Sequence, residues 1–124
     1  MYRIMLADDE GIMLEALKNI ITSNFGGECE IATAKTGRAV VELAERFRPD
    51  IAFMDIQMPV MNGYDAARKI RGLDDPQKAN IPIIAMTANA FTEDRQVALD
   101  AGMNDHIAKP INMNVLVPTL RKYL

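Results

Sequence analysis

Short apolar runs alternate along the chain with longer segments in which apolar residues recur at helical spacing. We expect strands at residues 3–7, 29–34, 51–54, 83–86 and 106–108, of which 51–54 and 83–86 are apolar throughout. The spacing predicts helices over residues 13–21, 39–47, 64–70, 92–101 and 115–123. Runs that are apolar throughout indicate strands covered on both faces. We therefore predict an α/β fold in one domain, residues 1–124, with a doubly wound, five-stranded parallel sheet in the flavodoxin-like order 2-1-3-4-5 and five helices on its two faces.

Three parts of the pattern are less regular. The polar stretch 74–80 predicts the longest loop. The apolar residues of the fourth predicted helix do not share one face, and they are Phe91, Val97, Ala98, Leu99 and Ala101. In the last helix, Pro118 is expected in the first turn or at a kink. The residues predicted to line the inner face of that helix are Val115, Leu116, Leu120 and Tyr123.

Composition narrows the class of protein. The 124 residues are 49% hydrophobic and 25% charged, which is typical of one globular domain. The formal charge of -3 gives no global basic field, so we expect no direct binding of nucleic acid. The lone cysteine, Cys29, excludes an intrachain disulfide and is expected in the core. No apolar run is long enough to span a bilayer, so we expect a cytoplasmic protein without membrane contact.

Polar side chains follow four of the predicted strands at the point where each strand ends. The first strand is followed by Asp8 and Asp9, the third by Asp55, the fourth by Thr87 and the fifth by Lys109. Ligands bind beyond the carboxyl ends of the strands in an open parallel sheet. We expect these three carboxylates, one hydroxyl and one ammonium to converge there.

This set of groups suggests phosphoryl chemistry. Clustered carboxylates repel one another unless a cation intervenes, and oxygen ligands without histidine or thiol favour Mg2+. Such a cation polarises phosphoryl oxygens, and Lys109 adds a second positive charge. One carboxylate could then attack phosphorus to form an acyl phosphate, with Thr87 donating a hydrogen bond to a phosphoryl oxygen.

Four motifs in this order resemble the receiver domain of a two-component response regulator, and the resemblance covers the whole chain. The motifs are Leu6-Ala7-Asp8-Asp9-Glu10, Met54-Asp55-Ile56-Gln57-Met58-Pro59-Val60-Met61-Asn62-Gly63, Ala85-Met86-Thr87-Ala88 and Ala108-Lys109-Pro110. The resemblance implies that Asp55 is the phosphoacceptor. It also implies that Mg2+ is held by Asp9 and Asp55 directly, by Asp8 largely through water, and by the backbone carbonyl of Gln57.

The resemblance further implies a switch that responds to the phosphoryl group. Thr87 is the expected switch hydroxyl and Lys109 the expected phosphate-binding ammonium. His106 stands where the family often has an inward-turning tyrosine or phenylalanine, so it is a third expected switch residue. The expected phosphodonor is a phosphohistidine on a sensor histidine kinase or a histidine phosphotransfer protein. The expected output surface for a further domain or partner comprises helix 4, strand 5 and helix 5, counted in the order predicted above. Because no free substrate is turned over, we do not predict an enzyme.

Other interpretations use the same residues. Asp8 or Asp9 alone could cap the next helix, and His106 could be a half-buried packing residue. An aspartate, a threonine and a lysine also occur in haloacid-dehalogenase-like phosphatases, but these have a second aspartate two residues after the nucleophile, where this chain has Gln57. A flavodoxin-like cofactor binder would need a phosphate-cradling loop after the first strand, where this chain has acidic residues.

Overall fold

The computed structural model describes residues 1–58, 61–88, 92–109 and 111–124, and of residues 92–94 only the backbone. Four residues named above lie outside the described residues: Pro59, Val60, Phe91 and Pro110. The strands are β1 (Tyr2–Ala7), β2 (Cys29–Ala34), β3 (Ile51–Asp55), β4 (Ile83–Thr87) and β5 (Asp105–Ala108). The helices are α1 (Gly11–Phe25), α2 (Gly37–Arg46), α3 (Gly63–Arg71), α4 (Pro76–Ala79), α5 (Thr92–Asp100) and α6 (Met113–Tyr123), and a 3-10 turn covers Gly26–Glu28.

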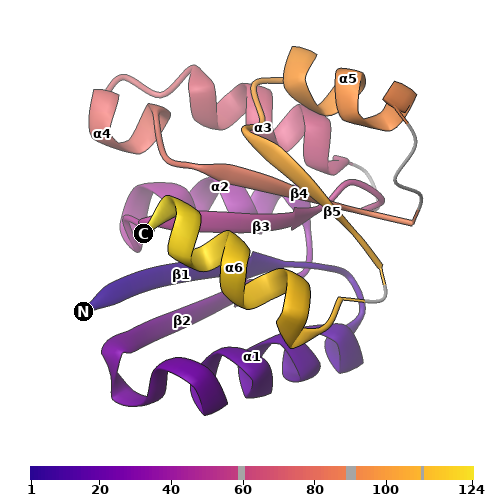
Figure 1. Ribbon diagram of the computed structural model, residues 1–124. Coiled ribbons are helices and arrows are strands. Elements are labelled where there is room, and N and C mark those ends of the chain that lie inside the picture. The colour runs from indigo at the N-terminus through magenta and orange to yellow at the C-terminus, as the bar shows by residue number, and fades with distance from the viewer. Residues whose placement is uncertain (59–60, 89–91, 110) are drawn as a thin grey trace.

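All neighbouring strands are parallel, and their order is β2-β1-β3-β4-β5 (Figure 1). The predicted doubly wound fold and strand order are therefore confirmed. Consecutive residues of β1 explain the unbroken apolar runs, because Ile4 and Leu6 belong to one hydrophobic cluster while Met5 and Ala7 belong to the other. Side chains alternate between the two faces of a strand, so both faces must be apolar when both are covered.

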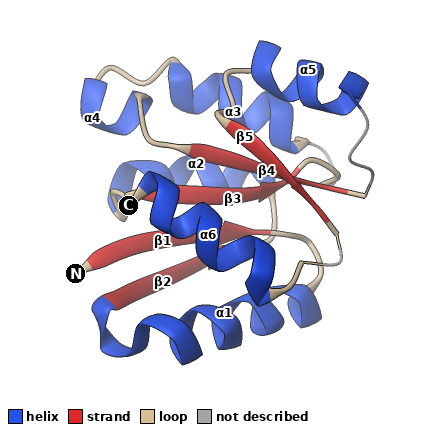
Figure 2. Ribbon diagram, in the orientation of Figure 1, coloured by secondary structure: helices blue, strands red, loops and turns tan. Residues whose placement is uncertain are grey.

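Helices cover each face of the sheet. The first face packs against α1 and α6 through residues such as Leu17 and Leu116, and the second face packs against α2, α3 and α5 through Val40, Ile70 and Ala98. Figure 2 shows α6 in front of the strands, with α2 and α3 behind them. Among the described residues, no helix is both long and apolar enough to cross a membrane.

The stretch 74–80, predicted to be a loop, contains the short helix α4. Asp75 accepts a hydrogen bond from the backbone N–H of Gln77 at 2.9 Å and caps this helix, and Pro76 is its first residue. Proline fits the first position of a helix because its missing N–H would have no partner there. The prediction that all of 74–80 is a loop was therefore wrong at Pro76–Ala79.

The last helix begins earlier than its apolar pattern indicated. Asn112 caps α6 by accepting a hydrogen bond from the N–H of Asn114 at 2.9 Å, and Pro118 lies inside the helix, beyond its first turn. The prediction that Val115 lines the inner face is wrong, because this side chain is exposed and Val117 is buried instead. In α5, Val97 and Leu99 are exposed, which agrees with its lack of one apolar face.

Candidate functional site

Two aspartates from neighbouring strands lie buried at the carboxyl edge of the sheet. Asp8 follows β1 and is 0% exposed, and Asp55 ends β3 and is 4% exposed. Asp8 Oδ1 accepts a hydrogen bond from the N–H of Glu10 at 2.9 Å, and Asp55 Oδ1 accepts one from the N–H of Gln57 at 3.0 Å. Each carboxylate thus uses one oxygen to hold the turn that follows it and directs Oδ2 elsewhere.

The ammonium of Lys109 bridges these two carboxylates. Its Nζ atom lies 2.9 Å from Asp8 Oδ2 and 3.1 Å from Asp55 Oδ2. The N–H of Lys109 donates to the carbonyl of Thr87 at 2.7 Å, which holds the end of β5 against the end of β4. The fold therefore brings together Asp8, Asp55 and Lys109, as the strand ends predicted.

Asp9 completes a cluster of oxygen donors. One carboxylate oxygen from each of Asp8, Asp9 and Asp55 can be chosen so that all three lie within 4.8 Å of one another. Asp9 is exposed, whereas the other two are buried, so the cluster opens to solvent on the Asp9 side. Three carboxylates without a sulfur or imidazole donor fit a hard divalent cation such as Mg2+, which keeps several of its waters.

The charges in this cluster influence one another. Burial raises the pKa of the Asp55 carboxyl, and the negative charge of Asp8 adds to the effect, although the N–H of Gln57 and the Lys109 ammonium act in the opposite direction. Burial alone lowers the pKa of Lys109, but its hydrogen bonds to Asp8 and Asp55, with their charges, outweigh burial and raise this pKa. Three carboxylates therefore face one firmly protonated ammonium, and the site favours a further cation.

The remaining predicted residues lie at different distances from this cluster. Thr87 is fully buried at the end of β4, one residue beyond Met86, which pairs with Asp55. His106 pairs with Ala85 farther back along the sheet, and its side chain is 16% exposed. The His106 Nδ1 atom is buried, lies 4.0 Å from Asp105 Oδ1 and has no hydrogen-bond partner among the described residues.

Gln57 and Gly63 lie beside Asp55, and Lys35 lies at the start of α1. The backbone N–H of Gln57 contacts Asp55, which places this residue next to the phosphoacceptor candidate. A Cβ atom built on Gly63 would lie 2.5 Å from the carbonyl oxygen of Asp55, so α3 begins directly against β3. Lys35 follows β2, and its Nζ would lie 3.4 Å from a Cβ built on Gly11 at the start of α1.

Comparison with known proteins identifies the family to which the chain belongs. The family model for the response regulator receiver domain matches residues 4–121. The chain therefore belongs to the response regulator receiver domain family, whose members are the phosphoacceptors of two-component and phosphorelay signalling. This membership favours a receiver over the phosphatase and flavodoxin-like alternatives.

Individual relatives include both stand-alone regulators and parts of larger proteins. Response regulator MprA of Mycolicibacterium vanbaalenii is 31% identical over 122 residues, which are 98% of this chain and 50% of that protein. Hybrid signal transduction histidine kinase L of Dictyostelium discoideum is 34% identical, and the match covers 98% of this chain but 7% of the kinase. The polar-differentiation response regulator DivK of Brucella anthropi is 28% identical, with 98% and 94% covered. The chain thus spans half or less of the first two relatives.

Solved structures of other receiver domains have the same fold, and one of them holds a magnesium ion in its active site cleft. The receiver domain of sensor histidine kinase PA1611 from Pseudomonas aeruginosa, solved with a magnesium ion in its active site cleft, has a TM-score of 0.86 and 34% identity, with 98% and 96% of the two chains covered. The receiver domain of Ssk1 from Saccharomyces cerevisiae, solved with the histidine phosphotransfer protein Ypd1, has a TM-score of 0.87 and 26% identity, with 98% and 88% covered.

Proposed function

We propose that residues 1–124 form one receiver domain in which Asp55 accepts a phosphoryl group from a phosphohistidine. The observation that carries this proposal is the Lys109 ammonium between Asp8 and Asp55, beside three clustered carboxylates. Asp8, Asp9, Asp55 and the backbone carbonyl of Gln57 would hold Mg2+. When bound, the cation withdraws negative charge from the phosphoryl oxygens.

The chemistry follows from how each oxygen of Asp55 is held. Oδ1 accepts the N–H of Gln57, so Oδ2 is the oxygen that attacks phosphorus. The new O–P bond forms as the bond from phosphorus to the donor's imidazole nitrogen breaks, with its electron pair staying on nitrogen. Lys109 already lies 3.1 Å from Oδ2, and its ammonium stabilises the negative charge that arrives with the phosphoryl group.

The Thr87 hydroxyl and His106 are the residues that would respond to the phosphoryl group on Asp55. The chain takes up one phosphoryl group and turns over no free substrate, so it is not an enzyme in the usual sense.

Exposed residues near the carboxyl edge of the sheet indicate the kind of partner that donates the phosphoryl group. Exposed apolar side chains lie at the start of two helices that follow the site strands: Ile12 in α1 is 88% exposed and Met113 in α6 is 54% exposed. Apolar residues beside an acidic cluster suit a helical donor, either a sensor histidine kinase or a histidine phosphotransfer protein. The output surface comprises α5, β5 and α6, where Val97, Leu99 and Val115 are exposed, and the compartment proposed for this signalling is the cytoplasm.

Incubation with a small acyl phosphate and Mg2+, followed by mass spectrometry, tests the proposal. Wild type should gain one phosphoryl group on Asp55 that is lost in base, and Asp55→Asn should gain none. Asp74→Asn is a suitable control because Asp74 is exposed in the loop before α4, far from the site in the sequence. Equal labelling of wild type and Asp55→Asn would disprove the assignment.

A further inference from the structure

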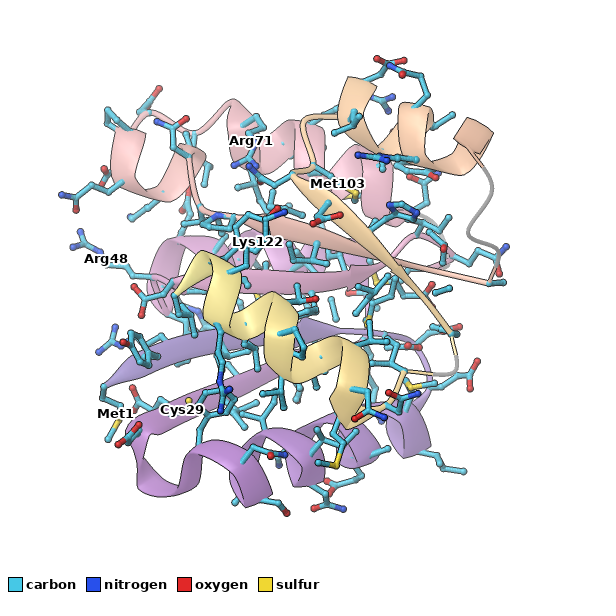
Figure 3. The ribbon with its side chains drawn as sticks, in the orientation of Figure 1. Met1, Cys29, Arg48, Arg71, Met103 and Lys122 are labelled. Atoms are coloured by element: carbon cyan, nitrogen blue, oxygen red, sulfur yellow. The ribbon has the colours of Figure 1, made fainter. Side chains whose placement is uncertain are left out.

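The guanidinium of Arg71, the last residue of α3, joins several segments at the edge of the sheet where β4 and β5 begin. Nε donates to the carbonyl of Gly102 at 2.8 Å, and Nη1 donates to the carbonyls of Ala79 at 2.6 Å and Ile81 at 2.8 Å. Nη2 donates to Asn104 Oδ1 at 2.8 Å. Figure 3 shows Arg71 beside Met103, just before β5. One side chain thus connects α3, the end of α4, the segment before β4 and the α5–β5 turn.

The partners of Arg71 in the described part of the chain are neutral oxygens. Burial lowers the pKa of this guanidinium. A planar fork with donors in fixed directions suits several acceptors at once, whereas an ammonium is a point charge. The arrangement is therefore specific for arginine.

Neighbouring residues are adapted to this contact. Gly102 has φ +95°, and a Cβ built on it would lie 2.9 Å from Cγ of Arg71, so glycine satisfies both the backbone and the available space. Asn104 Oδ1 also accepts the N–H of Ile83 at 2.9 Å, and the N–H of Asn104 donates to the carbonyl of Ile83 at 2.8 Å. Asn104 therefore extends the contact to the first residue of β4.

The opposite end of α3 lies against the phosphoacceptor candidate. A Cβ built on Gly63 would lie 2.5 Å from the Asp55 carbonyl oxygen, and the N–H of Gly63 donates to the carbonyl of Ile56 at 3.2 Å. The nine residues of α3 extend about 13 Å at the rise of an α-helix. One short helix thus connects the backbone of Asp55 with the Arg71 contact.

Among the side chains of α5 that the structure describes, residues 95–100, one is buried. Ala98 is buried, whereas Val97 and Leu99 are exposed. We propose that Arg71 is a positioning residue that fixes the turn after α5, residues 101–104, to α3, so that α5 moves about this fixed end when Asp55 is phosphorylated. The fixed end stands on the geometry alone, and the movement rests on the proposed function.

Hydrogen exchange measured by mass spectrometry tests the proposal in the 124-residue chain, before and after phosphorylation with a small acyl phosphate. The variant is Arg71→Gln, and the matched control is Arg68→Gln, because Arg68 lies on the same helix and makes an exposed ion pair with Asp65. Without phosphate, exchange of amides 101–104 should rise about tenfold or more in Arg71→Gln, while the control and the amides of α1 stay within about twofold of wild type. Arg71→Lys should not restore protection.

Phosphorylation provides the second part of the test. In wild type the change in exchange should be confined to residues 92–100, and in Arg71→Gln it should extend into 101–104. Should Arg71→Gln fail to fold, Asn104→Ala removes one acceptor and should raise exchange at the same amides less strongly, whereas Asn104→Asp keeps the acceptor and should preserve protection. A uniform rise over the whole chain, no rise at 101–104, or an equal phosphorylation response at 92–100 and 101–104 in wild type would overturn the proposal. Absence of labelling at Asp55 would overturn the proposed function and the movement of α5. The attachment of residues 101–104 by Arg71 would then be decided by the exchange measured without phosphate.

Discussion

Gly63 lies so close to Asp55 that a Cβ atom added to Gly63 would be 2.5 Å from the Asp55 carbonyl oxygen. The same atom would lie 2.8 Å from Cα of Ile56, so both obstructions are backbone. Backbone cannot rotate aside as the end of a flexible side chain can. The start of α3 and the phosphoacceptor candidate are therefore held in one fixed relation by the absence of a side chain.

Gly63→Ala should destabilise the domain by about 1–3 kcal/mol, because the added methyl forces β3 and α3 apart. The displacement should also slow phosphorylation by a small donor, since Asp55 is moved relative to Lys109. Gly27→Ala is the control, because a Cβ on Gly27 meets nothing within 4 Å. Urea denaturation measures the free energies of unfolding, and equal stabilities of the two variants would show that the contact can relax.

The central strands were predictable because burial on both faces leaves an unbroken apolar run. Residues 51–54 were predicted as a strand on this ground, and every residue of β3 (Ile51–Asp55) is buried. Residues 29–34 form β2 with the predicted bounds, although only Ala34 of this edge strand is buried. The site followed from the same logic, since parallel strands bring Asp8, Asp55 and Lys109 to one edge. Both results depend on local sequence and on a general property of parallel sheets.

Features that depend on packing between distant segments were not predictable. A helix was predicted over 64–70, but the contact of Gly63 with Asp55 is set by how α3 folds back onto β3. The partners of Arg71 lie 8 to 33 residues away in sequence. Val117 is buried on the inner face of α6 where Val115 was predicted, and this depends on how α6 packs on the sheet. The roles of Thr87 and His106 in switching stay predictions.

Asp55→Asn should stabilise the metal-free domain by about 1 kcal/mol, roughly the effect of one pKa unit. Burial raises the pKa of Asp55, so the folded state disfavours its charge, and asparagine keeps an oxygen for the N–H of Gln57. Because the folded pKa is raised, the variant's advantage should be present above it and vanish at pH below the ordinary value of 3.8. Urea denaturation in chelator measures the difference, which should shrink in saturating Mg2+. A less stable variant in chelator would mean that the ion pair with Lys109 outweighs the repulsion.

Asp9→Ala should weaken Mg2+ binding severalfold or more without unfolding the domain. Asp9 is the exposed member of the carboxylate cluster, so its removal deletes one of few protein ligands and no buried contact. Glu15→Ala is a control with the same change of charge, since the Glu15 side chain is 70% exposed on α1 and pairs at 3.8 Å with Lys18. Calorimetric titration with MgCl2 gives both affinities. Equal weakening by the two substitutions would indicate a general effect of net charge and no ligand role for Asp9.

Asp105 should make stability depend on pH at the other end of β5. Its Oδ1 accepts the N–H of His106 at 2.9 Å, and its Oδ2 lies 3.1 Å from the Tyr123 hydroxyl and 3.5 Å from Lys122 Nζ. Burial alone raises the pKa of Asp105, but these hydrogen bonds and the charge of Lys122 outweigh burial and lower the pKa below 3.8.

A folded pKa below the unfolded value means that the carboxylate stabilises the fold above the unfolded pKa, and that this contribution is lost as pH falls through the folded pKa. Asp105→Asn should therefore be less stable than wild type at neutral pH, by less than about 1 kcal/mol because the pair is partly exposed. The difference should decline below pH 3.8. Urea denaturation from pH 7 to pH 3 measures it, with Asp74→Asn as a control that should show no such decline. If the loss of unfolding free energy in Asp105→Asn stays constant with pH, the hydrogen bonds of Asp105 stabilise the protein without a contribution from its negative charge.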